Sequence, residues 1–174
     1  MRSRFALNGF LAAAQVVATC FMAWKAFSLW AGTPYPVMVV TTESMLPAFA
    51  PGDVLFITNH HRDVAIGDLP VCWLPGRAFP MVHRVHRVTY GEQSNSNPDP
   101  DSTHQQLILT KGDNNLIDDT FMYPDGQDFL SRSQVLGFVR GYVPFVGWVV
   151  IALQEFTQLL EVAAVLCRSI GLTC

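Results

Sequence analysis

Two segments of the sequence carry side chains that could together perform nucleophilic chemistry. Ser44 follows the apolar run Val37–Val40, and the end of a strand would hold its hydroxyl rigidly and leave it exposed. His83 lies in a run rich in β-branched residues, which predicts a strand. Side chains alternate between the two faces of a strand, so His83 and His86 point in opposite directions and do not suit a metal site. One of these histidines could face a cleft and take the proton of a serine.

The segment 111–119 could supply a carboxylate that orients such a histidine, as the third member of a catalytic triad does. Asp113, Asp118 and Asp119 crowd a turn that follows the apolar run 106–110. The spacing of an EF-hand calcium loop is absent. Turns rich in Asp and Asn also form for backbone reasons, so the pattern leaves open which of the three carboxylates meets the histidine.

The base that activates the serine could be a histidine or, as in serine–lysine peptidases, a lysine. The chain has two lysines. Lys25 lies in the apolar N-terminal run and cannot reach a site outside a membrane. Lys111 is close to Asp113, which favours the protonated form that cannot act as a base. Histidine has an unperturbed pKa of about 6.5, which suits proton transfer at neutral pH. His83 is therefore the better candidate, and Lys111 is the alternative.

The elements that must position these side chains begin with a predicted membrane anchor. Residues 10–31 are almost wholly apolar and are long enough to cross the ~30 Å hydrocarbon core of a bilayer. Arg2 and Arg4 outweigh Lys25, so we expect residues 1–9 to face the cytoplasm. A cleavable signal peptide is the alternative, but the run is too long for one and no small-x-small site follows it.

Residues 34–144 predict a mainly β domain with antiparallel strands. Short β-rich runs alternate there with Pro-Gly and Gly-Asp turn signals, a pattern typical of a sandwich or barrel and not of alternating strands and helices. Gly91–His104 is polar and predicts a surface loop between two strands. The predicted strands are Val37–Val40, Val54–Thr58, Leu69–Trp73, Met81–Tyr90, Gln106–Thr110 and Val135–Val143.

Residues 145–174 predict an apolar C-terminal helix with one polar stripe. Gln154, Glu155, Gln158 and Glu161 recur every three to four residues and therefore share one helix face. A second membrane span would bury this stripe in lipid at considerable cost. An amphipathic helix that lies on the membrane surface, or packs on a partner subunit, fits better.

The composition limits the classes of function. Half of the residues (50%) are hydrophobic and only 14% are charged, which is too apolar for a plain soluble domain. The net charge is −3 and there is no basic stripe, so we expect no nucleic-acid partner. None of the four cysteines forms a C-x-x-C pair. We therefore expect no metal and no cofactor.

Four stretches in this order resemble the catalytic subunit of the signal peptidase complex of the eukaryotic endoplasmic reticulum. They are ESMLPAFAPGDVLFITN, VHRV, LTKGDNNLIDD and VRGYVPFVGWV, and the resemblance spans nearly the whole chain. It implies a serine endopeptidase with Ser44 as nucleophile, His83 as general base and Asp119 as the triad carboxylate. It also implies that Asp113 is an additional essential acid. Thr42 stands where the family usually has serine, and its hydroxyl could still help to hold an oxyanion.

The resemblance also implies a location and partners. The chain would be a single-pass protein of the endoplasmic-reticulum membrane, with a mostly antiparallel β protease domain in the lumen. It would cleave signal peptides from preproteins at the lumenal face, together with accessory membrane subunits. A tethered β scaffold without activity is the alternative, because Leu46 stands where the family commonly has glutamate.

Overall fold

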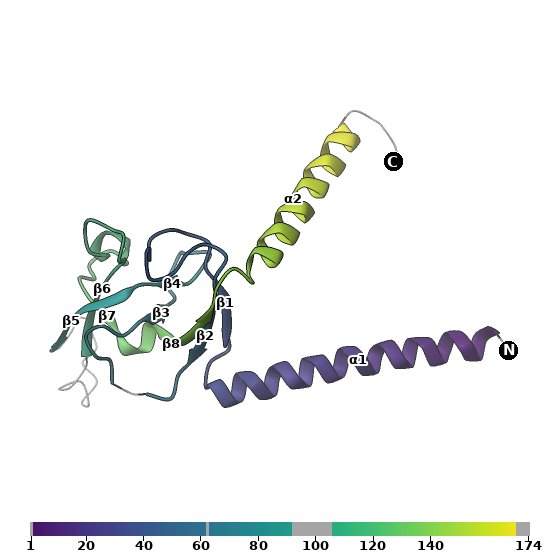
Figure 1. The fold of residues 1–174 in the computed structure, drawn as a ribbon, viewed down its shortest axis with the longest axis horizontal. Helices are drawn as coiled ribbons and strands as arrows, with labels where there is room; N and C mark the ends of the chain where they lie inside the picture. The colour runs from purple at the N-terminus through teal and green to yellow at the C-terminus, as the bar shows by residue number, and fades with distance from the viewer. Residues whose placement is uncertain (1, 62, 92–105, 170–174) are drawn as a thin grey trace.

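The computed structural model of the chain describes residues 2–61, 63–91 and 106–169. Beyond Gly91, the surface loop predicted for Gly91–His104 lies outside these residues. Figure 1 shows a β-rich body from which two helices, α1 (Arg2–Ala31) and α2 (Trp148–Ser169), leave on the same side and then diverge. The chain therefore has the predicted order of a helix, a β domain and a second helix.

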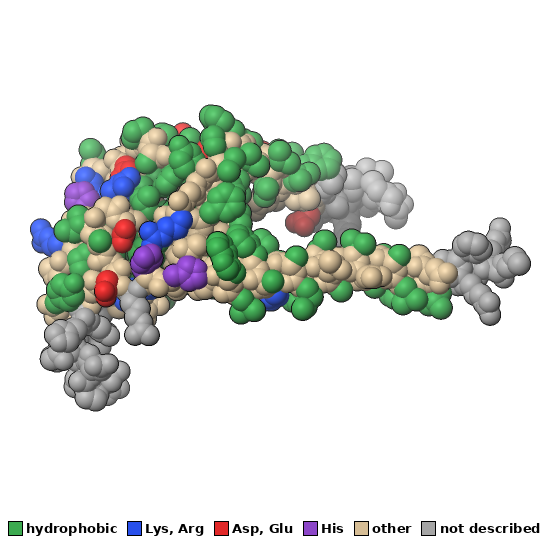
Figure 2. All heavy atoms as spheres, turned by 60° about the horizontal axis from the view of Figure 1, so that its bottom comes forward, with side chains coloured by type: hydrophobic (Ala, Val, Ile, Leu, Met, Phe, Trp, Pro, Cys, Tyr) green, Lys and Arg blue, Asp and Glu red, His purple; other side chains and the backbone are tan. Residues whose placement is uncertain are grey.

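Helix α1 is long and apolar enough to cross a membrane. Its segment Leu7–Ala31 has 25 residues and a mean hydropathy of 1.5, and none of its most apolar part is buried within the protein. It is the one such helix in the described part of the chain. Hydrophobic side chains line it in Figure 2. Gly32, at φ +68°, takes the left-handed conformation that ends the helix, which is where the predicted anchor stops.

The β domain consists of two sheets in which every pair of strands is antiparallel, which confirms the predicted fold class. One sheet has the order β1-β2-β8-β3-β4 and the other has the order β5-β6-β7. The strands are β1 (Val37–Val39), β2 (Val54–Thr58), β3 (Pro70–Cys72), β4 (Met81–Val82), β5 (Arg84–Tyr90), β6 (Gln106–Lys111), β7 (Leu130–Ser131) and β8 (Val135–Val143). The described part of the domain also has the short 3-10 helices η2 (Thr120–Met122) and η3 (Arg132–Gln134).

The core of the domain joins the two sheets. Buried side chains from both sheets form one apolar cluster, which includes Cys72 and Phe138 from the larger sheet and Val85 and Ile108 from the smaller one. Strands β4 and β5 belong to different sheets, yet only His83 separates them in the chain. The backbone of His83 is therefore held from both sides at the junction of the sheets.

The start of helix α2 packs against the loop that directly precedes β2. Gly147 N–H donates to the Gly52 carbonyl (2.8 Å), and Phe145 N–H donates to the buried Asp53 carboxylate (3.2 Å). A Cβ atom at Gly52 would lie 2.3 Å from the ring of Trp148, so only glycine allows this packing. The polar residues predicted to form one stripe are all exposed, as are most of the other side chains of α2 that the structure describes. What covers its apolar face stays a prediction.

Candidate active site

The Ser44 hydroxyl lies on a turn that follows shortly after the end of β1. The neighbouring turn, at the end of β6, holds this segment in place. Asn114 donates its backbone N–H to the Ser44 carbonyl (2.9 Å) and its side-chain amide to the Glu43 carbonyl (3.1 Å). A Cβ atom at Gly112 would lie 2.7 Å from the Ser44 carbonyl oxygen, so the two turns are in close contact. The serine is thus fixed through its backbone and its side chain stays free to react.

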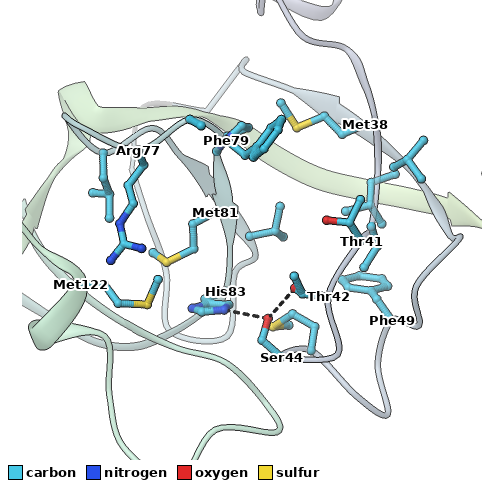
Figure 3. A pocket seen from close by; sticks show the side chains of 18 of the residues that line it. Met38, Thr41, Thr42, Ser44, Phe49, Arg77, Phe79, Met81, His83 and Met122 are labelled. Carbon is cyan, nitrogen blue, oxygen red and sulfur yellow. Dashed lines mark hydrogen bonds between the residues drawn. The ribbon is translucent and has the colours of Figure 1, made fainter. Parts of the chain in front are cut away.

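His83 connects this hydroxyl to a buried carboxylate. Its Nε2 atom is 3.0 Å from Ser44 Oγ, and its Nδ1 atom is 2.7 Å from Asp119 Oδ2. His83 is 4% exposed and Asp119 is 0% exposed, so the contact between them is shielded from water. Figure 3 shows the imidazole pointing at Ser44 across the floor of a pocket.

The contacts determine which ring nitrogen carries the proton. An ionised carboxylate only accepts hydrogen bonds, so Nδ1–H of His83 donates to Asp119. Nε2 then keeps its lone pair and accepts the hydroxyl hydrogen of Ser44. This is the tautomer that a general base needs, and in serine proteases the carboxylate holds the imidazole in it.

The other two acids of the turn have different partners. Both oxygens of Asp113 accept hydrogen bonds from Arg84, at 2.8 and 2.6 Å, and these bonds hold the pKa of Asp113 below its ordinary value. Asp118 accepts the side-chain hydroxyl of Thr120 at 2.7 Å, which lowers its pKa in the same way. Of the three predicted candidates, the structure brings Asp119 alone to the histidine.

The alternative base lies elsewhere. Lys111 borders a hollow that it shares with His86 and Asp118, whereas the pocket that holds Ser44 and His83 is not lined by it. His86 is exposed while His83 is buried, as the alternation of a strand predicts.

The pocket beside Ser44 is a cleft of about 660 Å³. Strands β1 and β4, which are the two edges of the larger sheet, supply Met38 and Val39 on one side and Met81 and Val82 on the other. Edge strands have unpaired backbone groups, so an extended peptide could hydrogen-bond between them. The cleft is lined mainly by apolar side chains.

The sequence predicts a possible role for the Thr42 hydroxyl and no metal site. The Thr42 hydroxyl lies 3.4 Å from Ser44 Oγ, on the rim of the cleft in Figure 3, and its part in holding an oxyanion stays a prediction. Among the described residues, no group of three or more His, Cys, Asp or Glu side chains could hold a metal ion.

Sequence reasoning missed three residues that support the site. They are Arg84, which binds Asp113, and Thr110 and Tyr123, which lie behind Asp119. Thr110 belongs to the predicted strand 106–110 and could have been recognised as inward-facing from the alternation of that strand. Arg84 and Tyr123 meet their partners only through the tertiary fold.

A serine hydroxyl that is hydrogen-bonded to a histidine, which in turn is hydrogen-bonded to a buried carboxylate, is the arrangement found in serine hydrolases. No protein-family model matches the chain. Curated relatives narrow the class. The chain is 44% identical over 156 residues to the signal peptidase complex catalytic subunit of Aspergillus terreus, which covers 86% of this chain and 81% of that one.

Two further relatives have the same description. The subunit of Blastomyces gilchristii is 41% identical over 160 residues, 86% of this chain and 82% of its own length. The subunit of Candida albicans is 40% identical over 156 residues, 89% of this chain and 87% of its own. The chain belongs to the family of signal peptidase complex catalytic subunits, and it is a serine peptidase that cleaves signal peptides.

Proposed function

We propose that the chain cleaves signal peptides with Ser44 as nucleophile, His83 as general base and Asp119 as the carboxylate that orients the imidazole. The observation that carries this assignment is the continuous contact from Ser44 Oγ to His83 Nε2 (3.0 Å) and from His83 Nδ1 to Asp119 Oδ2 (2.7 Å). Serine is a poor nucleophile unless a base within hydrogen-bond distance takes its proton. His83 meets that condition.

The reaction follows from these contacts. Ser44 Oγ attacks the carbonyl carbon of the scissile bond while its proton passes to His83 Nε2. The imidazolium then donates that proton to the leaving amine, and the carbon–nitrogen bond breaks to leave an acyl ester on Ser44. A water molecule gives a proton to His83 and attacks the ester, which releases the signal peptide and restores the serine. Asp119 stabilises the imidazolium in both halves.

The oxyanion of the tetrahedral intermediate needs donors that are already in place. The backbone N–H of Ser44 is one candidate, and the hydroxyl of Thr42 is the second. The Ser44 N–H belongs to the same peptide unit as the Glu43 carbonyl, and in a trans peptide the two point in opposite directions. Asn114 binds that carbonyl (3.1 Å), and it therefore fixes the direction of the Ser44 N–H.

The cleft supports a substrate in extended conformation between β1 and β4. Its apolar walls are close to Ser44, so we expect small residues before the scissile bond to fit and bulky ones to be rejected. A preprotein series with Ala, Leu or Phe directly before the bond tests this. Efficient cleavage after Leu or Phe would contradict it.

The location is also part of the proposal. Relatives are named as subunits of a signal peptidase complex, which implies other subunits as partners. We place residues 1–9 in the cytoplasm, an anchor at 10–31 across the endoplasmic-reticulum membrane and the domain 34–144 in the lumen. Helix 145–174 would lie on the bilayer or on a partner subunit. The apolar, unburied helix α1 and the exit of both helices from one side of the domain support this arrangement.

Cleavage of a preprotein by detergent-solubilised membranes tests the assignment. The membranes come from cells whose only copy of the chain is wild type, Ser44→Ala, His83→Ala or Lys111→Ala. The Ser44 and His83 variants should lose roughly 10⁴- to 10⁶-fold in kcat, by comparison with other serine proteases. Lys111→Ala should cleave like wild type. Equal cleavage by all four preparations would mean that another subunit is the peptidase and this chain is a scaffold.

A further inference from the structure

The carboxylate of Asp119 also accepts a hydrogen bond from a buried chain of two hydroxyl groups, neither of which lines the cleft. Thr110 Oγ1 lies 2.6 Å from Asp119 Oδ2, the same oxygen that accepts His83 Nδ1–H. The phenol oxygen of Tyr123 lies 3.0 Å from Thr110 Oγ1. Thr110 is 0% exposed and Tyr123 is 7% exposed, so this chain is closed to water.

The directions of these hydrogen bonds are determined by the acceptor at one end. The Asp119 carboxylate has no hydrogen to give, so the Thr110 hydroxyl donates to it. The Tyr123 hydroxyl must then donate to Thr110, and its own oxygen accepts the Thr110 backbone N–H at 3.0 Å. Both hydroxyl groups thus donate in the direction of Asp119, and the Thr110 hydroxyl meets the His83 Nδ1–H donor at one carboxylate oxygen.

The fold places these groups with little freedom. Asp119 and Tyr123 flank the short helix η2, so one tight turn presents both side chains to β6. Thr110 lies in β6 opposite Val85, and its carbonyl accepts the Asp119 backbone N–H at 3.1 Å. The second carboxylate oxygen, Oδ1, is buried and has no hydrogen-bond partner among the described residues. Without Thr110, His83 alone would hold the carboxylate group.

We infer that Thr110, supported by Tyr123, is a positioning residue for the peptidase reaction: its hydroxyl holds the Asp119 carboxylate in the orientation that His83 needs. This rests on the proposed roles of Ser44, His83 and Asp119. A buried polar chain with all of its donors satisfied is rigid, whereas a partly satisfied one loses geometry. Thr110 does not line the cleft that holds Ser44, and it acts through Asp119.

The titratable groups around the histidine–carboxylate pair keep one charge state across the neutral range. Burial raises the pKa of the Cys72 thiol and of the Tyr123 phenol to about 12 each. Asp113 is ionised and paired with Arg84. Burial lowers the pKa of Arg132, whose charge acts on Cys72, below its ordinary value. A change in the pH dependence of the reaction near neutrality therefore does not come from these groups.

The test compares Thr110→Val, Thr110→Ser and Tyr123→Phe in the assembled complex, with kcat, KM and the pH profile of preprotein cleavage as readouts. Valine keeps the shape of threonine and removes the donor, so kcat should fall roughly 10- to 100-fold, as when the hydrogen-bond partner behind a metal-bound histidine is removed. KM should stay unchanged, because the cleft is intact. Thr110→Ser keeps the donor, so its kcat should be close to that of wild type. In Tyr123→Phe, kcat should fall severalfold.

The pH profile separates positioning from a loss of packing. In Thr110→Val the Asp119 carboxylate loses the hydrogen bond from Thr110, and its negative charge then stabilises the protonated imidazole more strongly. The acidic limb of the pH profile should therefore move to higher pH. A mere packing defect would lower activity by the same factor at every pH. A profile parallel to wild type, or a serine variant as slow as the valine variant, overturns the inference. If Thr110→Val fails to assemble, wild-type kcat and pH profile in Tyr123→Phe overturn it.

Asp119→Asn, assayed beside these variants, separates the inference from the proposal on which it rests. Full activity in Asp119→Asn would remove the triad assignment itself. An inactive Asp119→Asn together with a Thr110→Val that matches wild type would leave the triad intact and contradict only the role of Thr110.

Discussion

Two carboxylates at opposite ends of one turn meet different surroundings in this domain. Asp119 is 0% exposed, and its one bonded oxygen accepts hydrogen bonds from His83 and Thr110. Asp113 lies six positions earlier in the chain, and its side chain is 20% exposed and paired with Arg84, whose side chain is 34% exposed. The same residue type is thus used once inside the domain and once near its surface.

Burial explains why the two acids differ in what they can do. Water screens the pair of Asp113 and Arg84, and exposed ion pairs of this kind contribute about 1 kcal/mol or less. The pair attaches the turn to β5, and Asn114 of the same turn binds the Ser44 loop. A carboxylate shielded from water interacts strongly with the few groups that it touches, and Asp119 touches the histidine. Chemistry is therefore expected at the buried end of the turn and support at the exposed end.

The largest effect should come from Asp119→Asn. An amide cannot hold the imidazole in the required tautomer, and we expect kcat to fall roughly 10⁴-fold, as in other serine proteases that lose this carboxylate charge. Cleavage of a preprotein by the purified complex measures it, with Asp118→Asn as the control, because the hydrogen bonds of Asp118 within the described residues go to Thr120 at the surface. A greater loss in Asp113→Asn than in Asp119→Asn would reverse the roles of the two acids.

A smaller effect on kcat should come from Gly112, the residue directly before Asp113. Gly112→Ala would place a methyl group 2.7 Å from the Ser44 carbonyl oxygen, and that backbone atom cannot move without moving the nucleophile. A misplacement of this size in an active site can cost about 100-fold in rate, so we expect a fall in kcat of up to that size. Gly141→Ala is the matched control, since its added methyl group has no atom within 4 Å. Equal rates in the two variants would show that the turn does not position Ser44.

Loss of the ion pair between Asp113 and Arg84 should reduce kcat less than Asp119→Asn or Gly112→Ala does. In Asp113→Asn, the turn that carries Asn114 loses one of its attachments, and we expect about a tenfold decrease in kcat, the lower limit for an outer support. Arg84→Gln should give the same decrease, and the double variant should lose no more than either single one. Additive losses would mean that the two side chains act independently.

The pair should also contribute to stability in a pH-dependent way. Hydrogen bonds from Arg84 hold the pKa of Asp113 below its ordinary value of 3.8. A lowered pKa in the folded state adds stability that is present above pH 3.8 and is lost as the pH falls through the lowered value. The thermal midpoint of Asp113→Asn should therefore lie slightly below wild type at neutral pH and converge with it in strong acid. A constant difference down to low pH would exclude the ion pair as its cause.

Much of the fold follows from local patterns in the sequence. The strands expected at Val54–Thr58 and Val135–Val143 have the observed bounds, because turn residues delimit apolar runs of strand length. The alternation of a strand also separates His83, which is buried, from His86, which is exposed. These features depend on neighbours in the chain, and a single sequence contains that information.

The choice among the three acids of the turn depends on packing that the local pattern does not contain. Asp118 and Asp119 are adjacent in sequence. Yet Asp118 is partly exposed and hydrogen-bonded to Thr120, whereas Asp119 is buried and hydrogen-bonded to His83. The difference arises because η2 folds back onto β6, a contact that no spacing predicts. Resemblance to a family selected Asp119, and the geometry agrees with that selection.

The most direct measurement is covalent labelling by a peptide phosphonate diester with a small side chain next to phosphorus. Attack by the nucleophile displaces an aryloxide and leaves a stable ester, whose position mass spectrometry identifies in the purified complex. We expect the adduct on Ser44, at a rate that falls sharply in His83→Ala and Asp119→Asn and is unchanged in Lys111→Ala. An adduct on another residue, or labelling of Ser44 at the wild-type rate in His83→Ala, would contradict the account.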